Sequence, residues 1–228
     1  LAGRSDGEVA VIAEIKRRSP SRGNLDSDLD PTEMARQYMA GGAACLSVLT
    51  DQTFFGGSTS DLRMARGAVD LPVLRKDFTV DVRDVCDACI MGADAVLLIV
   101  VALDDRELAD FHTLASELGM EALVEVHTEG DLERALAVGA SFVGVNQRDL
   151  STFEVDSCRA VQLAARIPRE VVRVAESGIG RPAEAVALME AGYDALLVGE
   201  SLIAATDRAA AVQAVPRIYG WFCSSRSN

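Results

Sequence analysis

The stretch MGADAVLLIVVALDDRELADFHTLASELGMEALVEVH, residues 91–127, holds one complete unit of a pattern that recurs along the chain. Its apolar runs at 95–101 and 121–126 are typical of buried strands, and residues 104–118 between them have the apolar period of a helix. Glycine ends this helix in ELGM, because it adopts the left-handed backbone conformation of a helix end without strain. The stretch therefore predicts two parallel strands joined by a helix.

The same alternation extends in both directions from this stretch. Strands are expected at 9–15, 45–50, 72–76, 95–101, 121–126, 142–146, 171–176 and 195–199. Helices are expected near 31–41, 59–68, 81–91, 104–118, 129–138, 156–166, 182–191 and 206–214. Eight strand–helix pairs with no Pro/Ser-rich linker between them predict the α/β class and a single (β/α)8 TIM barrel.

The predicted domain covers 1–228, with the barrel at about 9–215 and a tail at 216–228 that does not fit the repeat. A doubly wound open sheet is the alternative architecture. Such a sheet more commonly carries a G-x-G-x-x-G turn after its first strand, and the sequence has none there. The barrel is therefore the favoured fold.

The charge balance narrows the function classes. With 22 Lys and Arg against 35 Asp and Glu, the formal net charge is −13, which disfavours nonspecific binding of nucleic acid or anionic membranes. The longest apolar run, 95–103, is too short to span a membrane, and the first eight residues lack the layout of a signal peptide. A phosphate ligand must therefore be held by local amides and cations.

The cysteines and histidines indicate a reducing compartment and no metal. Five scattered cysteines in a non-secretory chain predict free thiols and a cytoplasmic location. CDAC at 86–89 has redox spacing but lies within a predicted helix, where structural thiols are favoured over a redox pair. His112 and His127 are far apart, so we expect no metal site.

Polar residues gather where the predicted strands run into the following loops. They are Glu14 and Lys16 on the first strand, Lys76 on the third, Glu125 on the fifth, Asn146 and Arg148 on the sixth, and Glu176 and Ser177 on the seventh. In a TIM barrel the chemistry sits at this carboxyl end. One charged strand end is commonly a solvated tip, but several meeting at one rim indicate a site, because buried charge is costly unless it is paired.

Two of these loops also favour an anion. ESGIG (176–180) and GESL (199–202) place the amides of Ser177, Gly178, Gly199 and Glu200 at loop-to-helix starts, where a phosphate is well bound. Helix caps and tight turns alone remain the alternative for these segments. A third anchor is expected in SPSRG, where Ser19 and Ser21 lie near Lys16. Lys16 would face a negative substrate, with Glu14 pairing its ammonium in the empty site.

With these residues identified, the chain resembles the indole-3-glycerol-phosphate synthase family of tryptophan biosynthesis from about residue 9 to 205. The resemblance is carried by IAEIKRRSPSRG (12–23), LSVLTDQTFFGGS (46–58), PVLRKDF (72–78), GADAVLLI (92–99), LVEVH (123–127), GVNQRDLSTFEVD (144–156), AESGI (175–179) and DALLVGESL (194–202). It implies a lyase without cofactor, which closes 1-(2-carboxyphenylamino)-1-deoxyribulose 5-phosphate into indole-3-glycerol phosphate and releases carbon dioxide and water.

The resemblance also implies roles. Lys76 would protonate the ribulose carbonyl, Lys16 would hold the substrate carboxylate, and Glu125 would serve the dehydration, although the division of acid roles among these three stays open. Glu14 and Glu176 would tune and orient the lysines, and Asn146 and Arg148 would position the substrate and the acids. The phosphate would be bound by Ser177, Gly178, Gly199 and the amide of Glu200, with Ser19 in the matching serine-proline motif. The aromatic ring would meet Leu49, Phe55, Phe78 and Leu98, with core packing as the alternative for Leu49 and Leu98.

The start of the chain departs from the family. The segment before the first strand is shorter than the lid segment usual in the family, so we expect a short or missing lid, and no fused isomerase.

Two classes of rival function are considered. One is another phosphate-binding barrel enzyme, such as an isomerase, a Schiff-base aldolase using Lys76 or a flavin-binding barrel, and the other is a non-catalytic binder. The expected partner is a phosphorylated small molecule rather than nucleic acid or membrane. The oligomeric state is open, with a monomer favoured.

Overall fold

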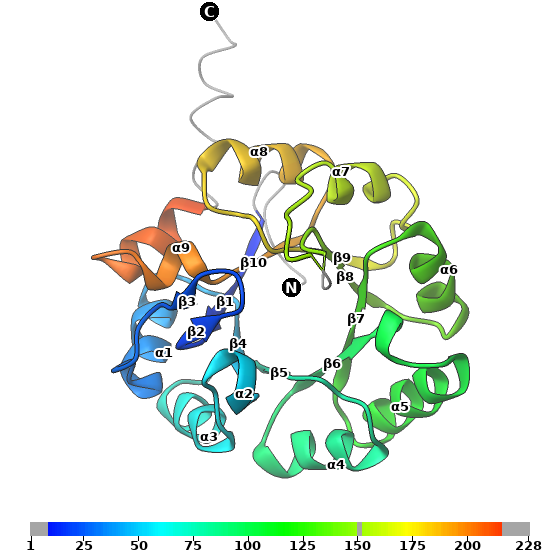
Figure 1. Cartoon of the computed structure of the whole chain (residues 1–228), viewed down its shortest axis with the longest axis horizontal. Helices are drawn as coiled ribbons and strands as arrows, with labels where there is room; N and C mark the ends of the chain where they lie inside the picture. The colour runs from blue at the N-terminus through cyan, green and yellow to red at the C-terminus, as the bar shows by residue number, and fades with distance from the viewer. Residues whose placement is uncertain (1–8, 150–151, 216–228) are drawn as a thin grey trace, which may run out of the picture.

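The computed structural model describes residues 9–149 and 152–215, and within them eight parallel strands close into a barrel. The strands are β1 (Ala10–Ile15), β4 (Cys45–Leu49), β5 (Val73–Lys76), β6 (Ala95–Ile99), β7 (Glu121–Val126), β8 (Phe142–Asn146), β9 (Val172–Glu176) and β10 (Ala195–Val198). β1 closes the ring by pairing with β10 in the register Ala10↔Ala195 and with β4 in the register Ile12↔Cys45. The predicted TIM barrel is confirmed (Figure 1).

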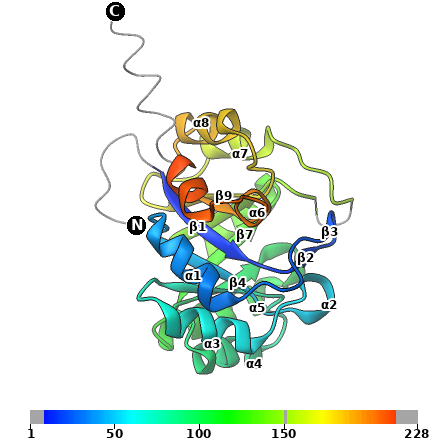
Figure 2. The ribbon, with the colours of Figure 1, turned by 90° about the vertical axis from the view of Figure 1, so that its left-hand side faces the viewer.

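A ring of helices surrounds the strands in Figure 1, and Figure 2 shows the barrel from the side. The helices are α1 (Pro31–Ala40), α3 (Thr59–Ala68), α4 (Val82–Met91), α5 (Asp105–Glu117), α6 (Glu129–Ala137), α7 (Arg159–Ala164) and α8 (Pro182–Glu190), and residues 208–215 are also helical. Short elements lie between them: β2 (Arg18–Ser19), β3 (Gly23–Asn24), α2 (Gln52–Phe55), the 3-10 turn η1 (Val100–Ala102) and α9 (Glu200–Ile203).

Local sequence explains where the helices begin. Asp30 caps α1 by accepting a hydrogen bond from the amide of Thr32, with Pro31 at the first helical position. Thr128 and Asp131 form a reciprocal capping box at the start of α6. These caps satisfy amides that would otherwise lack partners at helix starts, so each helix begins directly after a strand and its loop.

The strands separate two apolar layers. Side chains that point outward pack against the helices, and those that point inward fill the barrel, as Ile12, Leu74, Leu97 and Leu123 do. Along most strands the inward file is apolar at its start and polar at its end, as in Leu74 followed by Lys76 and Leu123 followed by Glu125. The apolar floor thus supports a polar upper layer at the carboxyl ends of the strands.

The differences from expectation are local. β6 ends at Ile99, and the residues expected to extend it form η1. α7 is shorter than the expected 156–166, and the hairpin of β2 and β3 was not predicted. The segments 1–8 and 216–228, on which the expected lid and tail fall, lie outside the described residues.

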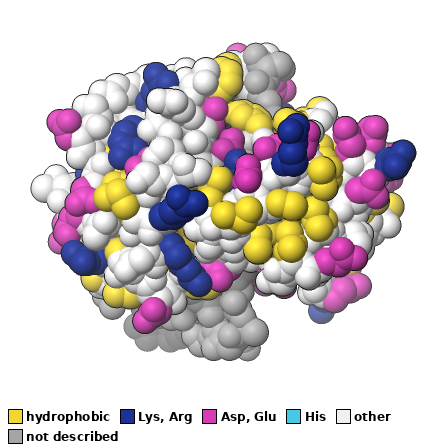
Figure 3. All heavy atoms as spheres, turned by 90° about the horizontal axis from the view of Figure 1, so that it is seen from below, with side chains coloured by type: hydrophobic (Ala, Val, Ile, Leu, Met, Phe, Trp, Pro, Cys, Tyr) yellow, Lys and Arg dark blue, Asp and Glu magenta, His cyan; other side chains and the backbone are white. Residues whose placement is uncertain are grey.

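The surface and the thiols add little to the functional argument. The CDAC sequence lies in α4, with Cys86 and Cys89 free and half-buried. Acidic and basic side chains lie interspersed on the face seen in Figure 3. Among the described helices, none combines the length and the apolar character that crossing a membrane requires.

Candidate active site

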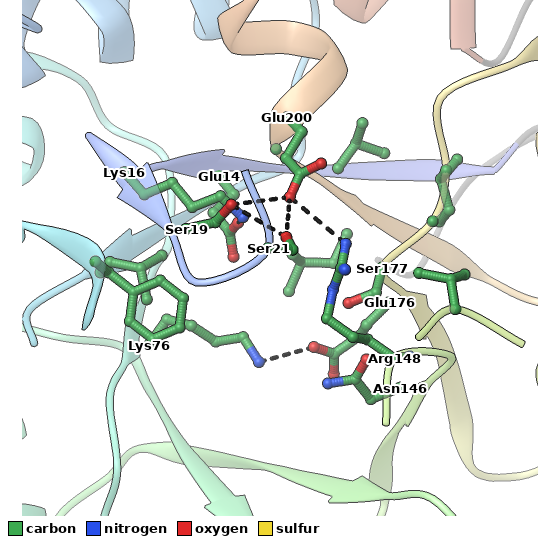
Figure 4. Close-up of a pocket in the computed structure, with 18 of the residues that line it drawn as sticks. Glu14, Lys16, Ser19, Ser21, Lys76, Asn146, Arg148, Glu176, Ser177 and Glu200 are labelled. Atoms are coloured by element: carbon green, nitrogen blue, oxygen red, sulfur yellow. Dashed lines mark hydrogen bonds and ion pairs between the residues drawn. The ribbon is translucent and has the colours of Figure 1, made fainter. Parts of the chain in front are cut away.

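A cavity of about 800 Å³ opens at the carboxyl ends of the strands. Every residue that the sequence placed in the site lines it except Leu98. These residues are Glu14, Lys16, Ser19, Leu49, Phe55, Lys76, Phe78, Glu125, Asn146, Arg148, Glu176, Ser177, Gly178, Gly199 and Glu200. The barrel therefore brings together side chains from seven strand ends that are far apart in the sequence. Figure 4 shows several of them, among them Lys16, Lys76 and Glu176.

Lys76 lies at the centre of the buried charges. Its Nζ donates to Oε2 of Glu125 at 2.7 Å and to Oε2 of Glu176 at 2.8 Å. Both carboxylates are almost completely buried. Because the three residues lie at or next to the carboxyl ends of β5, β7 and β9, the closed sheet itself determines this contact.

The two carboxylates differ in their surroundings. Oε1 of Glu125 accepts a hydrogen bond from Nδ2 of Asn146 at 3.0 Å, whereas Oε1 of Glu176 is buried without a partner among the described residues. Gly144 explains how Glu176 fits, because a Cβ at that position would overlap Oε1 of Glu176. Glu176 is therefore the less well stabilised of the two carboxylates.

The pKa values follow from these contacts. Burial disfavours the charged form of Lys76, but the carboxylates, led by Glu125 and Glu176, outweigh it and raise its pKa. Burial would also raise the pKa of Glu125, but Lys76 and His127 lower it below its usual value. Burial raises the pKa of Glu176 to about 7, with Lys76 opposing the shift and Glu125 adding to it. The pKa of Lys76 is thus raised, whereas a lysine tuned to act as an acid would need a pKa lowered toward neutrality.

Glu14 and Lys16 form the second ion pair. They are two residues apart at the end of β1, and Nζ of Lys16 lies 2.5 Å from Oε1 of Glu14. The expected pairing of the Lys16 ammonium with Glu14 is confirmed. Gly199 lies against the pair, because a Cβ there would be 2.5 Å from Oε1 of Glu14.

Arg17 anchors the loop that follows Lys16. Its guanidinium donates to Oδ1 of Asp61 at 3.0 Å, and also to the backbone oxygens of Leu29 and Gly56, each at 3.2 Å. This contact leaves no local pattern in the sequence and was not predicted. It joins the β1–α1 loop to the start of α3, and so fixes the backbone next to Lys16.

The turn after β9, which is expected to bind an anion, has an unusual backbone. Ser177 and Gly178 have positive φ angles of 67° and 70°, and a Cβ on Gly178 would collide with Val155. Nε2 of Gln147 donates to the carbonyl of Ser177 at 2.8 Å and holds this turn. The turn lies beside Gly199 and Glu200 in the cavity wall.

Apolar side chains line another part of the cavity. Leu49, Phe55 and Phe78 lie there as expected, and the rings of Phe55 and Phe78 have centroids 6.4 Å apart. Leu98 is a wrong prediction: it points outward into the layer between strands and helices, while Leu97 and Ile99 line the cavity.

A family model described as Indole-3-glycerol phosphate synthase matches residues 1–215 of the chain. The chain belongs to the indole-3-glycerol phosphate synthase family. A relative of that name from a Nocardioides species is 52% identical over 204 residues, which are 90% of this chain and 78% of the relative. Another, from Chlorobium chlorochromatii, is 50% identical over 199 residues, or 87% of this chain and 77% of the relative.

The chain resembles several solved structures in its fold alone. A 3-hexulose-6-phosphate synthase superposes with a TM-score of 0.73 at 19% identity, covering 92% of this chain and 99% of that chain. An N-acetylmannosamine-6-phosphate 2-epimerase from Clostridium perfringens gives 0.65 at 14% identity, covering 86% and 88%. The resemblance to the indole-3-glycerol phosphate synthase family is thus confirmed, and the barrel is shared with enzymes of other names.

The basic residues of this chain are unevenly divided between lysine and arginine. The sequence contains only two lysines, Lys16 and Lys76, and both line the cavity. All its other basic side chains apart from the two histidines are arginines, which do not release a proton in proteins. The two ammonium groups able to exchange protons are therefore both placed in one cavity.

His127 is a further residue that the sequence analysis considered only as a metal ligand. Its Nε2 lies 3.7 Å from Oε1 of Glu125, and its ring nitrogens are buried without hydrogen-bond partners among the described residues. The alternation in LVEVH points His127 to the same side as Glu125, which is the signal that could have found it. In the described part of the chain, no group of three or more His, Cys, Asp or Glu side chains is placed to bind a metal.

Proposed function

We propose that this protein is an indole-3-glycerol-phosphate synthase. It would close 1-(2-carboxyphenylamino)-1-deoxyribulose 5-phosphate into indole-3-glycerol phosphate and release carbon dioxide and water. Membership of the family supports the activity. The observation that carries the chemistry is the position of Lys76 between Glu125 and Glu176, in the same cavity as the Lys16–Glu14 pair.

The cavity offers a separate region for each part of the substrate. The substrate carboxylate would replace Glu14 as the partner of the Lys16 ammonium. The phosphate would lie at the turn of Ser177 and Gly178 and the start of α9, where Gly199 allows close approach. The aromatic ring would lie against Leu49, Phe55 and Phe78, and also against Leu97 and Ile99, which replace the expected Leu98.

Ring closure would use Lys76 as the acid. The ring carbon that bears the carboxylate attacks the ribulose carbonyl, and Nζ of Lys76 donates a proton to the carbonyl oxygen as negative charge develops on it. The bond to the carboxylate then breaks, carbon dioxide leaves, and its electron pair restores the aromatic ring. Lys16 would hold the carboxylate until this bond breaks.

The dehydration would rely on Glu125. The new hydroxyl group leaves as water with one more proton, and the neighbouring carbon loses a proton to form the double bond of the indole. Glu125 is suited to accept that proton, because its lowered pKa keeps it ionised, and Asn146 holds it in place. Across both steps one proton is taken up from solvent.

Glu176 would return a proton to Lys76 after each transfer. With a pKa of about 7, it carries a proton on a substantial fraction of molecules at neutral pH, and its Oε2 contacts Nζ of Lys76 directly. After Lys76 has given its proton to the substrate, the adjacent carboxylic acid can return one. This contact lets a lysine with a raised pKa act as an acid repeatedly.

We also propose that the protein works as a single barrel domain in the cytoplasm and binds a phosphorylated small molecule without a cofactor. Each step is a proton transfer, a carbon–carbon bond change or the loss of a hydroxyl group as water, for which acid and base side chains are sufficient. A Schiff-base aldolase is less well supported, because the raised pKa of Lys76 keeps its nitrogen protonated and without a free electron pair. Borohydride trapping with ketose phosphates tests this alternative.

The direct test is to add the carboxyphenylamino ribulose phosphate to the purified protein and follow indole fluorescence together with released carbon dioxide. The proposal predicts equal amounts of both products. Folded protein that forms neither product would overturn it. A reduced lysine adduct with a ketose phosphate, in the absence of indole formation, would support the aldolase instead.

A further inference from the structure

The carboxylate of Glu200 gathers four donors from two other loops. Its Oε1 accepts from the hydroxyls of Ser19 and Ser21, each at 3.2 Å, and lies 3.5 Å from Nη2 of Arg148. Its Oε2 lies 2.9 Å from Nε of Arg22. Figure 4 shows Glu200 between the serines and Arg148 at the mouth of the cavity.

These donors come from distant parts of the chain. Ser19, Ser21 and Arg22 belong to the hairpin of the β1–α1 loop, Arg148 follows β8, and Glu200 begins α9. All of them line the cavity, and the side chain of Glu200 is 22% exposed. A ligand in the cavity can therefore reach the same donors.

The donor set has the chemistry of a phosphate site. Two guanidinium groups and two hydroxyls match the oxygens of a phosphate, and guanidinium is the preferred partner for such planar, paired contacts. Two positive charges against the single charge of Glu200 leave an excess of one positive charge, which a dianion satisfies better than a second carboxylate. The carboxylate and a phosphate cannot share these donors without mutual repulsion.

We propose that the Glu200 carboxylate is an internal substitute for the substrate phosphate. It holds the donors in the empty enzyme, and the incoming phosphate displaces it from them. This inference rests on the proposed function, since it gives a role to the side chain of a residue that the family resemblance involves only through its amide. Glu200 then determines anion specificity, because a ligand must bind the donors more strongly than a carboxylate that is already in place.

The test is the binding of inorganic phosphate, measured by calorimetry, to wild-type protein and to Glu200→Gln. The variant keeps the shape of the side chain and removes the competing charge, so we expect phosphate to bind about tenfold more tightly. Glu184→Gln is the matched control, because Glu184 lines the same cavity but pairs with Arg181 instead of the four donors. Its phosphate affinity should change less than about twofold by the same measure.

Equal or weaker phosphate binding by Glu200→Gln would overturn the inference and show that the carboxylate only positions the arginines. An equal gain in Glu184→Gln would also overturn it, because the effect would then be general electrostatics. Glu200→Ala provides a second variant with the same expected direction if Glu200→Gln does not fold.

Hydrogen exchange of residues 17–24 gives an independent readout. Without its carboxylate anchor, the hairpin of Glu200→Gln should exchange faster than that of the wild type, and phosphate should restore its protection. If phosphate does not change the hydrogen exchange of the variant hairpin, the proposed displacement of Glu200 by phosphate is wrong.

The inference and the proposed function fail separately. If the wild type forms indole product but Glu200→Gln binds phosphate no more tightly, the proposed displacement of Glu200 is wrong and the proposed function stands. If phosphate binds as expected but no indole product forms, the proposed activity is wrong, and the displacement of Glu200 belongs to a phosphate site of another reaction.

Discussion

Nζ of Lys76 lies 2.8 Å from Oε2 of Glu176, although the two residues are 100 positions apart in the sequence. The contact joins a lysine whose pKa is raised to a carboxyl group whose pKa is raised to about 7. Since Glu125 beside them has Asn146 as a further donor, Glu176 is the carboxylate that takes up a proton first. Lys76 therefore lies between a base and a proton donor.

Replacing each lysine by arginine separates the proposed acid from the proposed carboxylate holder. Arginine keeps the positive charge but does not give up a proton. We expect Lys76→Arg to lose turnover by about a hundredfold to ten-thousandfold, as Lys76→Met should, whereas Lys16→Arg should mainly raise KM. Steady-state kinetics by indole fluorescence measures both, and more than a tenth of normal turnover in Lys76→Arg would remove Lys76 as the acid.

Glu125→Gln should block the reaction after decarboxylation. In a single turnover we expect carbon dioxide to appear before indole, with indole formation slowed by about a hundredfold or more. Glu121→Gln is the control, because Glu121 lies exposed at the opposite end of the same strand. If both products keep appearing together at the normal rate in Glu125→Gln, the dehydration does not depend on Glu125.

Glu176→Gln should change stability in a pH-dependent way. The pKa of Glu176 in the folded protein, about 7, lies above its value of 4.5 in the unfolded chain, so the folded state binds more protons between these values and its stability falls as pH rises. The uncharged variant does not carry this loss. Urea unfolding at pH 5 and pH 8 should show the variant gaining on the wild type at pH 8.

Glu184 serves as a comparison, because its pKa is shifted in the opposite direction to that of Glu176. Its pKa is lowered, because the amides of Gly180 and Arg181 and the Arg181 side chain outweigh the effect of its burial. Its stabilising contribution is present above its unfolded pKa and is lost as pH falls through its folded pKa. Because pH 5 and pH 8 both lie above that unfolded value of 4.5, Glu184→Gln should be less stable than the wild type by about the same amount at both pH values. The same trend in both variants would contradict the assignment for Glu176.

Gly144→Ala should displace Glu176 without replacing a charged residue. The added methyl would overlap Oε1 of Glu176 and lie 3.2 Å from Cδ1 of Leu123, so we expect a stability loss of about 1–3 kcal/mol and a lower kcat. Gly67→Ala on α3 is the control, because its methyl would meet nothing within 4 Å. A normal kcat in Gly144→Ala would show that the position of Glu176 is unimportant.

The sequence predicted the barrel well, because each unit repeats the same signals. Helices that end at glycine and begin at caps such as Asp30 and Thr128 bracket each strand closely. Polar strand ends could also be assigned to the cavity, since Glu125 and Glu176 follow an apolar file with a period of two.

Two kinds of feature could not be predicted. In the run at 95–101 both faces are apolar, so alternation does not tell which side points inward, and Leu98 was chosen where Leu97 and Ile99 face the cavity. Contacts between distant segments, such as Arg17 with Asp61 and Ser19 with Glu200, leave no local pattern in the chain. These contacts depend on loop conformations that form only after the barrel closes.

The pairing of β1 with β10 has a consequence for synthesis on the ribosome. Glu14 and Lys16 emerge early, but Gly199, which packs against Glu14, belongs to the last unit of the ring. Until that unit has left the exit tunnel, the nascent sheet keeps two open edges and the cavity has no wall on that side. Chemistry would thus begin only when nearly all of the described chain has been translated, so a prematurely terminated product would be inactive rather than partly active.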